Sequence, residues 1–310
     1  MNSRSLKTLF SAGLAAFCMS TAGAAPSARA ATPAARQAAP EVVVTTTRLG
    51  GNVFAVDGQG GRISALVGPD GIFLVDAQFP AVTDKIVAAL RLLSPSPIKF
   101  VMNSHVHGDH TGGNENFAKL GATIMAQPNL RMRLMKPSPG ANGQTPPPAP
   151  AGALPTLLYD KPFSLQMNGE TVQIIPLTPG HTDGDSAAKF VTADVLATGD
   201  VFRSVGFPNI DRANGGTLKG LLESMETFIS LAGPNTKVAP GHGDITNRAG
   251  IVAHRDMIVT VRDRVATLKS EGKTVDQIVA AKPTADLDEK VGNAAASADR
   301  FVQQLFAELR

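Results

Sequence analysis

The chain has 310 residues, of which 43% are hydrophobic and 18% charged, and its formal net charge is +3. Two of the positive charges, Arg4 and Lys7, lie within the first 24 residues, so the chain without them carries +1. A nearly neutral chain lacks the electrostatic footprint of a nucleic-acid-binding protein, which argues against a nuclease and favours a small-molecule substrate.

Residues 1–30 have the features of a secretory signal peptide and export leader. A positive start precedes the short apolar run Thr8–Thr21, and small residues at 22–24 and 28–30 offer two cleavage sites. The apolar run is too short to span a membrane. We expect a periplasmic or secreted protein with no membrane span after signal cleavage; a retained, uncleaved anchor is the alternative. Cleavage would also remove Cys18, the only cysteine, so the mature chain has no thiolate ligand or nucleophile.

Residues 31–310 are expected to form one domain whose C-terminal part is helical. Periodicity and β-branched content predict its first half, with strands at 42–47, 52–56, 62–67, 72–75, 97–102 and 122–126 and helices at 81–93, 114–120 and 131–135. In the second half, Asn168-Gly169 predicts a hairpin between strands 163–167 and 171–176. Further strands are predicted at 186–191, 195–198 and 236–239, a helix at 218–231, and mostly helix from 247 onward.

The stretch His105-Val106-His107-Gly108-Asp109-His110 is the strongest chemical signal in the chain, because it holds three of the six histidines. Imidazole nitrogen and carboxylate oxygen are ligands that suit zinc, iron or manganese. His105 and His107 follow a strand and can point the same way while the backbone is extended. Gly108 is expected to allow a sharp turn, after which Asp109 and His110 face a second point. The stretch therefore offers two ligands to one metal ion and two to a neighbouring ion.

This motif resembles that of the metallo-β-lactamase-fold hydrolases, in which His-x-His-x-Asp-His is followed by a third histidine, an aspartate and a last histidine. The later pieces are present in that order as Thr178-Pro-Gly-His181, Leu196-Ala-Thr-Gly-Asp200 and Val238-Ala-Pro-Gly-His242. The resemblance covers about residues 41–260 and implies an α/β (α+β) fold, the four-layer αββα sandwich, with a metal pair in a groove at one edge of its two sheets. It implies a first zinc on His105, His107 and His181, a second on Asp109, His110 and His242, and Asp200 as the carboxylate that bridges them.

The segment 201–216 follows Asp200 directly and is expected to line the groove. By the same resemblance, Arg203 would bind a substrate carboxylate, which its guanidinium can do bidentately; the alternative is an ordinary surface arginine. Asn209 and Asn214 are candidates for polarising a substrate carbonyl.

Several other residues have two interpretations. Asp76, at the end of a strand, either orients a ligand histidine or is simply solvated. The glycine-containing hairpin 57–61 is either a mobile lid over the groove or an ordinary turn. The proline-rich segment 136–154 is expected to be a structureless surface insertion that could reach the groove. Tyr159 is expected to pack in the core, with a substrate contact as the alternative, and His254 to lie partly exposed on a helix outside the site.

The resemblance implies a dinuclear zinc-dependent hydrolase in which a metal-bridging hydroxide opens an amide or ester bond. Asp109 would orient the hydroxide or carry a proton to the leaving group, and iron or manganese could replace zinc. Because export implies a substrate outside the cytoplasm, β-lactam hydrolysis is the first candidate activity. Asp200 departs from the cysteine or serine usual in lactamases, which makes a lactone or thioester hydrolase, lactonase-like or glyoxalase II-like, the alternative. A non-catalytic metal-binding accessory protein is the third hypothesis.

Overall fold

The computed structural model of the chain describes residues 41–139, 143–292 and 294–309. The expected signal peptide and export leader at 1–30, with Cys18, lie outside the described residues. Among those that are described, no helix combines the length and the apolar character needed to cross a membrane.

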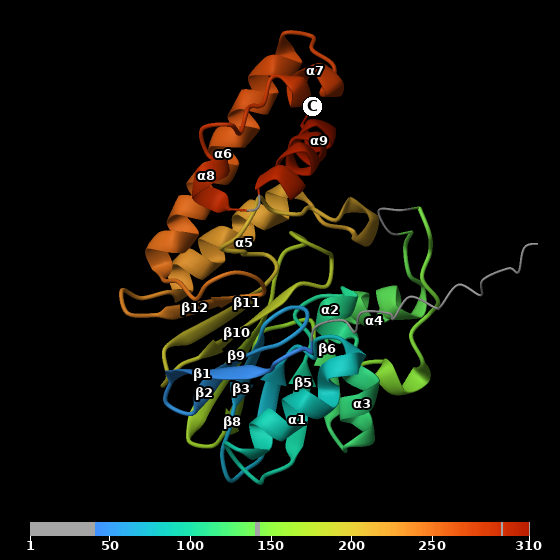
Figure 1. Ribbon diagram of the computed structural model, residues 1–310, viewed down its shortest axis with the longest axis vertical. Helices are drawn as coiled ribbons and strands as arrows, with labels where there is room; N and C mark the ends of the chain where they lie inside the picture. Colours follow the sequence, from blue (N-terminus) through green and yellow to red (C-terminus); the bar gives the residue numbers. More distant parts are fainter. Residues whose placement is uncertain (1–40, 140–142, 293, 310) are drawn as a thin grey trace, which may run out of the picture. The chain divides into compact units, whose positions relative to one another are not determined.

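Two β-sheets form the centre of the fold (Figure 1). The seven-stranded sheet runs in the order β1 (Thr45–Gly50), β2 (Val53–Asp57), β3 (Ile63–Leu66), β4 (Ile72–Val75), β5 (Ile98–Met102), β6 (Thr123–Ala126) and β7 (Leu157–Leu158). The five-stranded sheet runs in the order β12 (Lys237–Pro240), β11 (Val195–Gly199), β10 (Ser186–Phe190), β9 (Glu170–Pro176) and β8 (Phe163–Met167). β4 to β7 are parallel, as are β11 and β12, and the other pairs are antiparallel.

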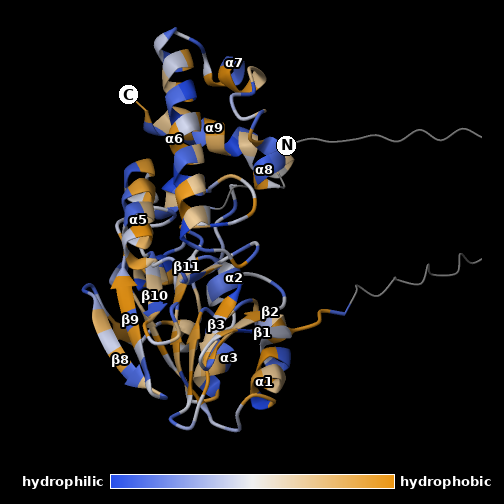
Figure 2. Cartoon of the chain, turned by 90° about the vertical axis from the view of Figure 1, so that its left-hand side faces the viewer, coloured by the Kyte–Doolittle hydropathy of each residue, from blue (hydrophilic) through white to orange (hydrophobic). Residues whose placement is uncertain are grey.

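Helices cover the outer faces of both sheets. The α-helices are α1 (Thr83–Arg91), α2 (Gly108–Thr111), α3 (Asn114–Lys119), α4 (Pro128–Met135), α5 (Leu218–Leu231), α6 (Arg248–Ser270), α7 (Val275–Ala280), α8 (Asp288–Val291) and α9 (Ala298–Glu308). Short 3-10 helices occur as η1 (Pro80–Val82), η2 (Ala151–Ala153), η3 (Arg212–Asn214) and η4 (Ala294–Ala296). The hydropathy colouring of Figure 2 shows largely hydrophobic strands, whereas α6 carries hydrophobic and hydrophilic residues side by side.

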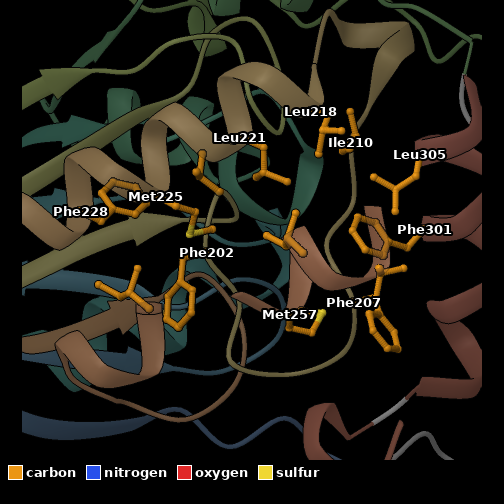
Figure 3. Packing of buried hydrophobic residues seen from close by; sticks show 14 of the residues in the cluster. Phe202, Phe207, Ile210, Leu218, Leu221, Met225, Phe228, Met257, Phe301 and Leu305 are labelled. Atoms are coloured by element: carbon orange, nitrogen blue, oxygen red, sulfur yellow. The ribbon is translucent and has the colours of Figure 1, made fainter. Parts of the chain in front are cut away.

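Three buried clusters explain why the layers stack. β11 illustrates the two-residue alternation of strand side chains, because Val195 and Ala197 point into the cluster between the sheets while Leu196 points outward. The outward cluster joins the five-stranded sheet to α5, α6 and α9 (Figure 3). A third cluster joins the outer face of the seven-stranded sheet to α1 and α3. Helix, sheet, sheet and helix layers therefore result, which confirms the predicted αββα sandwich.

Most predicted elements lie where the sequence placed them. The hairpin turns at Asn168 and Gly169, whose φ angles of 57° and 72° suit such a turn, and α5 has the predicted bounds. The first strand was predicted too early. It begins at Thr45 because its pairing starts opposite Asp57, the last residue of β2, so the residues before it have no partner in that strand.

Candidate metal centre and adjoining cavity

The predicted metal ligands all follow the carboxyl ends of strands. β5 leads into the stretch 105–110, β9 precedes the loop that carries His181, β11 ends just before Asp200, and β12 ends just before His242. These strands come from both sheets, so the ligands meet at one edge of the sandwich. The structure brings together every residue that the sequence analysis proposed as a ligand.

The side chains form three overlapping groups in which one donor atom of each member lies within 4.8 Å of the others. The groups are His105, His107 and His181; His105, His110 and Asp200; and Asp109, His110 and His242. The carboxylate of Asp200 lies between the two histidine sets, 3.4 Å from His110 Nε2, 3.4 Å from His242 Nε2 and 4.0 Å from His181 Nε2.

The nitrogen and oxygen atoms of this cluster are better suited to binding metal cations than to hydrogen bonding with one another. His181 Nε2 lies 3.0 Å from His107 Nδ1, and His110 Nε2 lies 3.4 Å from His242 Nε2. Two buried atoms, His105 Nε2 and Asp200 Oδ1, have no hydrogen-bond partner among the described residues. Buried polar atoms without partners are costly and rare. Ring nitrogens and carboxylate oxygens that converge at these distances match the nitrogen and oxygen donor set of a divalent metal site.

The charge state of the cluster also suits cations. Burial lowers the pKa of His105 well below its ordinary value and that of His181 to about 4, so both imidazoles are neutral at pH 7. Burial would raise the pKa of Asp200, but the charge of His110 and the neighbouring imidazoles hold it well below its usual range. The centre therefore combines two neutral imidazoles with an ionised carboxylate. Although burial would lower the pKa of His110, the carboxylates of Asp76 and Asp200 raise it well above its ordinary value, so a metal ion that binds His110 displaces a proton from it.

Asp76 lies behind the cluster and fixes one ligand. Its Oδ2 accepts a 2.8 Å hydrogen bond from His110 Nδ1, and its carboxylate also accepts from the backbone N–H and the hydroxyl of Ser104. The residue is buried, and its φ of 72° places it in the left-handed region. Asp76 is therefore not simply solvated but orients His110, one of the candidate ligands.

Replacing Asp76 by asparagine is expected to weaken metal binding about 10- to 100-fold, the usual effect of losing such an orienting carboxylate. Asparagine keeps the shape and tolerates the positive φ. It removes the charge that holds His110, and it replaces one of the two accepting oxygens by an amide group that can only donate. Competitive metal titration would measure the change. Asp70→Asn, in an exposed turn where Asp70 accepts from Asn168, is the control. Wild-type affinity in Asp76→Asn would contradict the orienting role.

Three supporting contacts were not predicted. Asp211 Oδ2 accepts from His107 Nε2 at 2.7 Å, and the carbonyl of Asn209 accepts from His181 Nδ1 at 2.7 Å. Asp185 is buried and accepts the backbone N–H groups of both His181 and Thr182. A carboxylate four residues after a ligand in the turn-rich run 178–186 was a usable signal for this last contact. The other two contacts span sequence separations that no local pattern reports.

The predicted substrate contacts lie near the centre in different ways. Arg203 Nη1 is 3.9 Å from Asp200 Oδ2. Asn209 and Asn214 both line the cavity beside the centre, but the Asn209 side chain accepts from Gln304 and the Asn214 amide donates to Asp211. Their roles toward a substrate stay predictions.

A cavity of about 720 Å³ adjoins the centre at His107. One wall comes from the proline-rich segment, through Pro137, Pro139, Pro146 and Pro147, which confirms that this segment reaches the groove. We call its described residues 136–139 and 143–150 the proline strap. The facing wall comes from the loop 209–214 and from α9.

The hairpin 57–61 is attached at Gly61 to the ligand stretch, while its residues 58–60 are exposed, so its role as a lid stays a prediction. The backbone N–H of Gly61 donates to the carbonyl of Asp109, and Arg62 Nη1 donates to the carbonyl of Gly243. Gly108, by contrast, begins α2 without a positive φ, so the prediction that it makes a sharp turn is wrong. Its turn is an ordinary first turn of a helix.

Two other predictions resolve differently. Tyr159 packs in the cluster between the sheets, which confirms its core role. His254 lies outside the metal centre, as predicted, but it is buried against Phe202 rather than partly exposed. His254 is buried because α6 packs against the loop that follows Asp200, which carries Phe202.

Comparisons with known proteins agree with this geometry. The sequence-family model of the metallo-beta-lactamase superfamily matches residues 56–242 of the chain, a range that includes all the candidate ligands. Hydroxyacylglutathione hydrolase from Nitrosococcus oceani is 29% identical over 160 residues, 50% of this chain and 52% of that protein. The chain spans between 52% and 59% of the length of the curated relatives it matches.

Solved structures show the same fold. The sec-alkylsulfatase Pisa1 from Pseudomonas sp. matches with a TM-score of 0.63 and 17% identity, over 85% of this chain and 50% of that chain. A metallo-beta-lactamase from Pontibacter korlensis matches with a TM-score of 0.55 and 13% identity, over 69% of this chain and 99% of that chain. At these identities the likeness concerns the fold alone.

Proposed function

The chain belongs to the metallo-beta-lactamase superfamily, and from this premise we propose that it is a hydrolase whose His/Asp cluster holds two metal ions. His105, His107 and His181 would hold one ion, Asp109, His110 and His242 the other, and Asp200 would contact both. Zinc is the first choice for this donor set, and iron or manganese are compatible with it. When bound, such ions would lower the pKa of water and polarise a carbonyl.

One side of the cluster is open to a substrate, and this observation carries the proposal. His105, His110 and His181 are buried, whereas the side chains of His107, Asp109 and His242 are 27%, 26% and 24% exposed. His107 also lines the cavity. A substrate in the cavity therefore approaches the cluster from its exposed side, with the buried histidines behind it.

Asp109 is the residue placed to move a proton. Although burial would raise its pKa, the hydrogen bond to His242 and the charge of His110 lower it, so the carboxylate is ionised at neutral pH. Its Oδ2 lies 3.0 Å from His242 Nε2 on the open side. We assign it the acceptance of a proton from the attacking water and its delivery to the leaving group.

Esters and thioesters are the substrates that the chain's features favour. Asp200 stands where the resemblance places cysteine or serine in lactamases and a bridging aspartate in thioesterases and lactonases, and its position between both ligand sets supports the second group. The relative from Nitrosococcus oceani is a hydroxyacylglutathione hydrolase by name. The expected export keeps β-lactams as the second candidate.

The proposal is tested on the purified protein by elemental analysis and by hydrolysis of a thioester, a lactone and a β-lactam. We expect two metal ions per chain and hydrolysis that falls at least about 10³-fold on chelation, since the ions supply several kcal/mol of stabilisation. Added zinc should restore it. Metal-bound protein that hydrolyses none of the three would favour the accessory-protein hypothesis, and protein that binds no metal would contradict the ligand assignment.

A further inference from the structure

Three arginines line the cavity beside the metal centre, and two of them already have carboxylate partners. Arg133 Nη2 lies 2.8 Å from Asp183 Oδ2, and Arg212 Nε lies 2.9 Å from Glu308 Oε1. The third, Arg300, has no hydrogen bond or ion pair with any residue in the described ranges. Arg300 is therefore the cavity arginine whose charge the described protein leaves without a partner.

A second arginine increases this positive charge. Burial, and then the charge of Arg203, lower the pKa of Arg300, so the two guanidinium groups interact with like sign. Arg203 Nε is buried without a hydrogen-bond partner among the described residues. The carboxylate within 4.0 Å of Arg203 is that of Asp200, which belongs to the metal centre. In the part of the chain that the structure describes, Arg300 has no such carboxylate, so an anion bound beside it would offset the repulsion between the two guanidinium groups.

The position of Arg300 is fixed by the packing of α9. Phe301 and Leu305 are buried in the cluster that joins α9 to α5 and α6, and Figure 3 shows both facing the loop that carries Phe207 and Ile210. Gln304 lies one turn after Arg300, on the same side of the helix. It accepts from the backbone N–H of Ile210 and donates to Asn209, which binds α9 to the cavity wall.

The rest of the cavity wall is mainly apolar. The proline strap contributes prolines, which have no backbone N–H to donate, and Val106, Leu134, Ala149 and Ile210 add aliphatic groups. The strap is attached at both sides, because Ala149 N donates to the Leu134 carbonyl and Ser138 Oγ donates to the Ala213 carbonyl. Such a wall stabilises a hydrocarbon chain by removing it from water.

We propose that the cavity binds an amphiphilic anion, whose apolar chain lies along the proline strap and whose anionic group is bound by Arg300. The inference deepens the proposed function, on which it rests for the cleaved bond, and it makes the substrate an ester or thioester with an apolar part and a separate anionic group. Arg300 lies outside residues 56–242 that match the family, so this specificity comes from the chain's own C-terminal helix.

The test is calorimetric titration of the full chain, metal-free and zinc-loaded, with octanoate and with its neutral counterpart octanamide. Octanoate should bind at least about tenfold more tightly than octanamide, since hydrogen bonds to charged groups contribute more than neutral ones. Arg300→Gln should lose that preference and Arg300→Lys recover part of it. Arg262→Gln removes the same charge from the surface of α6, where Arg262 pairs with Asp263, and should keep wild-type binding. Butanoate should bind more weakly than octanoate, by about fourfold per methylene buried.

The outcomes separate this inference from the proposed function. Arg300-dependent octanoate binding in metal-free protein supports the inference even if no metal binds and the hydrolase proposal fails. Equal affinities for octanoate and octanamide, wild-type octanoate affinity in Arg300→Gln, or no octanoate binding in either form would overturn it. Octanoate binding that requires zinc and is unchanged in Arg300→Gln would place the anion on the metal centre. That result would also overturn the inference.

Discussion

Alanine at position 61 is expected to remove one metal ion from the centre, although Gly61 lies 44 residues before the first ligand. An ideal Cβ on Gly61 would overlap the His110 ring at Cε1 and Nε2 and lie 2.7 Å from its Nδ1. The ring cannot move aside freely, because it is buried and bound to Asp76. The hairpin cannot move back freely, because Gly61 N donates to the Asp109 carbonyl.

Displacing His110 moves a donor away from Asp109 and His242, so the second metal set loses one of its three residues. We expect Gly61→Ala to retain about one metal ion per chain, to lose at least about 100-fold in hydrolysis, and to lose roughly 1–3 kcal/mol of stability through overpacking. Elemental analysis, kinetics and thermal unfolding measure these effects.

Gly108→Ala is the matched control for Gly61→Ala. Gly108 lies inside the ligand stretch itself, yet a Cβ there would meet no atom within 4 Å and its φ is not positive. Gly108→Ala should therefore keep its metal content and its stability. Two metal ions in Gly61→Ala, or metal loss in Gly108→Ala, would contradict the packing argument.

The substitution Asp200→Asn is expected to lower the rate of hydrolysis at least about 10³-fold and to prevent the two metal ions from binding together. The substitution preserves the shape but removes the negative charge that lies between the two ligand sets. Two metal ions at adjacent sites then repel each other, because no anion lies between them. Loss of one metal ion removes several kcal/mol of transition-state stabilisation.

Asp194→Asn provides the comparison for Asp200→Asn. Asp194 pairs with Lys189 and Thr236 in the hairpin of β10 and β11, outside the metal groups. Its substitution is expected to cost stability while metal stoichiometry stays at two. A shift of unfolding temperature on adding zinc reports the same difference, because a ligand that binds only the folded state stabilises it. An unchanged zinc-dependent shift in Asp200→Asn would show that the carboxylate is not shared.

Much of the centre could be predicted from sequence because each ligand lies in a short motif at the end of a strand. Histidines and aspartates beside glycines and turn residues are uncommon enough to be recognised, and strand ends at one sheet edge bring them together. Asp76 was identified in the same way, since it directly follows the buried strand β4. The β8–β9 turn and α5 were predicted for a similar reason, because their signals lie within a few neighbouring residues.

The amino-acid sequence by itself determined the donor set, the order of the strands along the chain, and the family. Only the tertiary structure decided that Gly61 touches His110, that Asp211 holds His107, and that Arg300 and the proline strap share one cavity. The physical reason is the range of the interactions. Turn and strand preferences act between neighbours in the chain, whereas these contacts depend on how buried side chains such as Phe301 and Leu305 pack distant elements together.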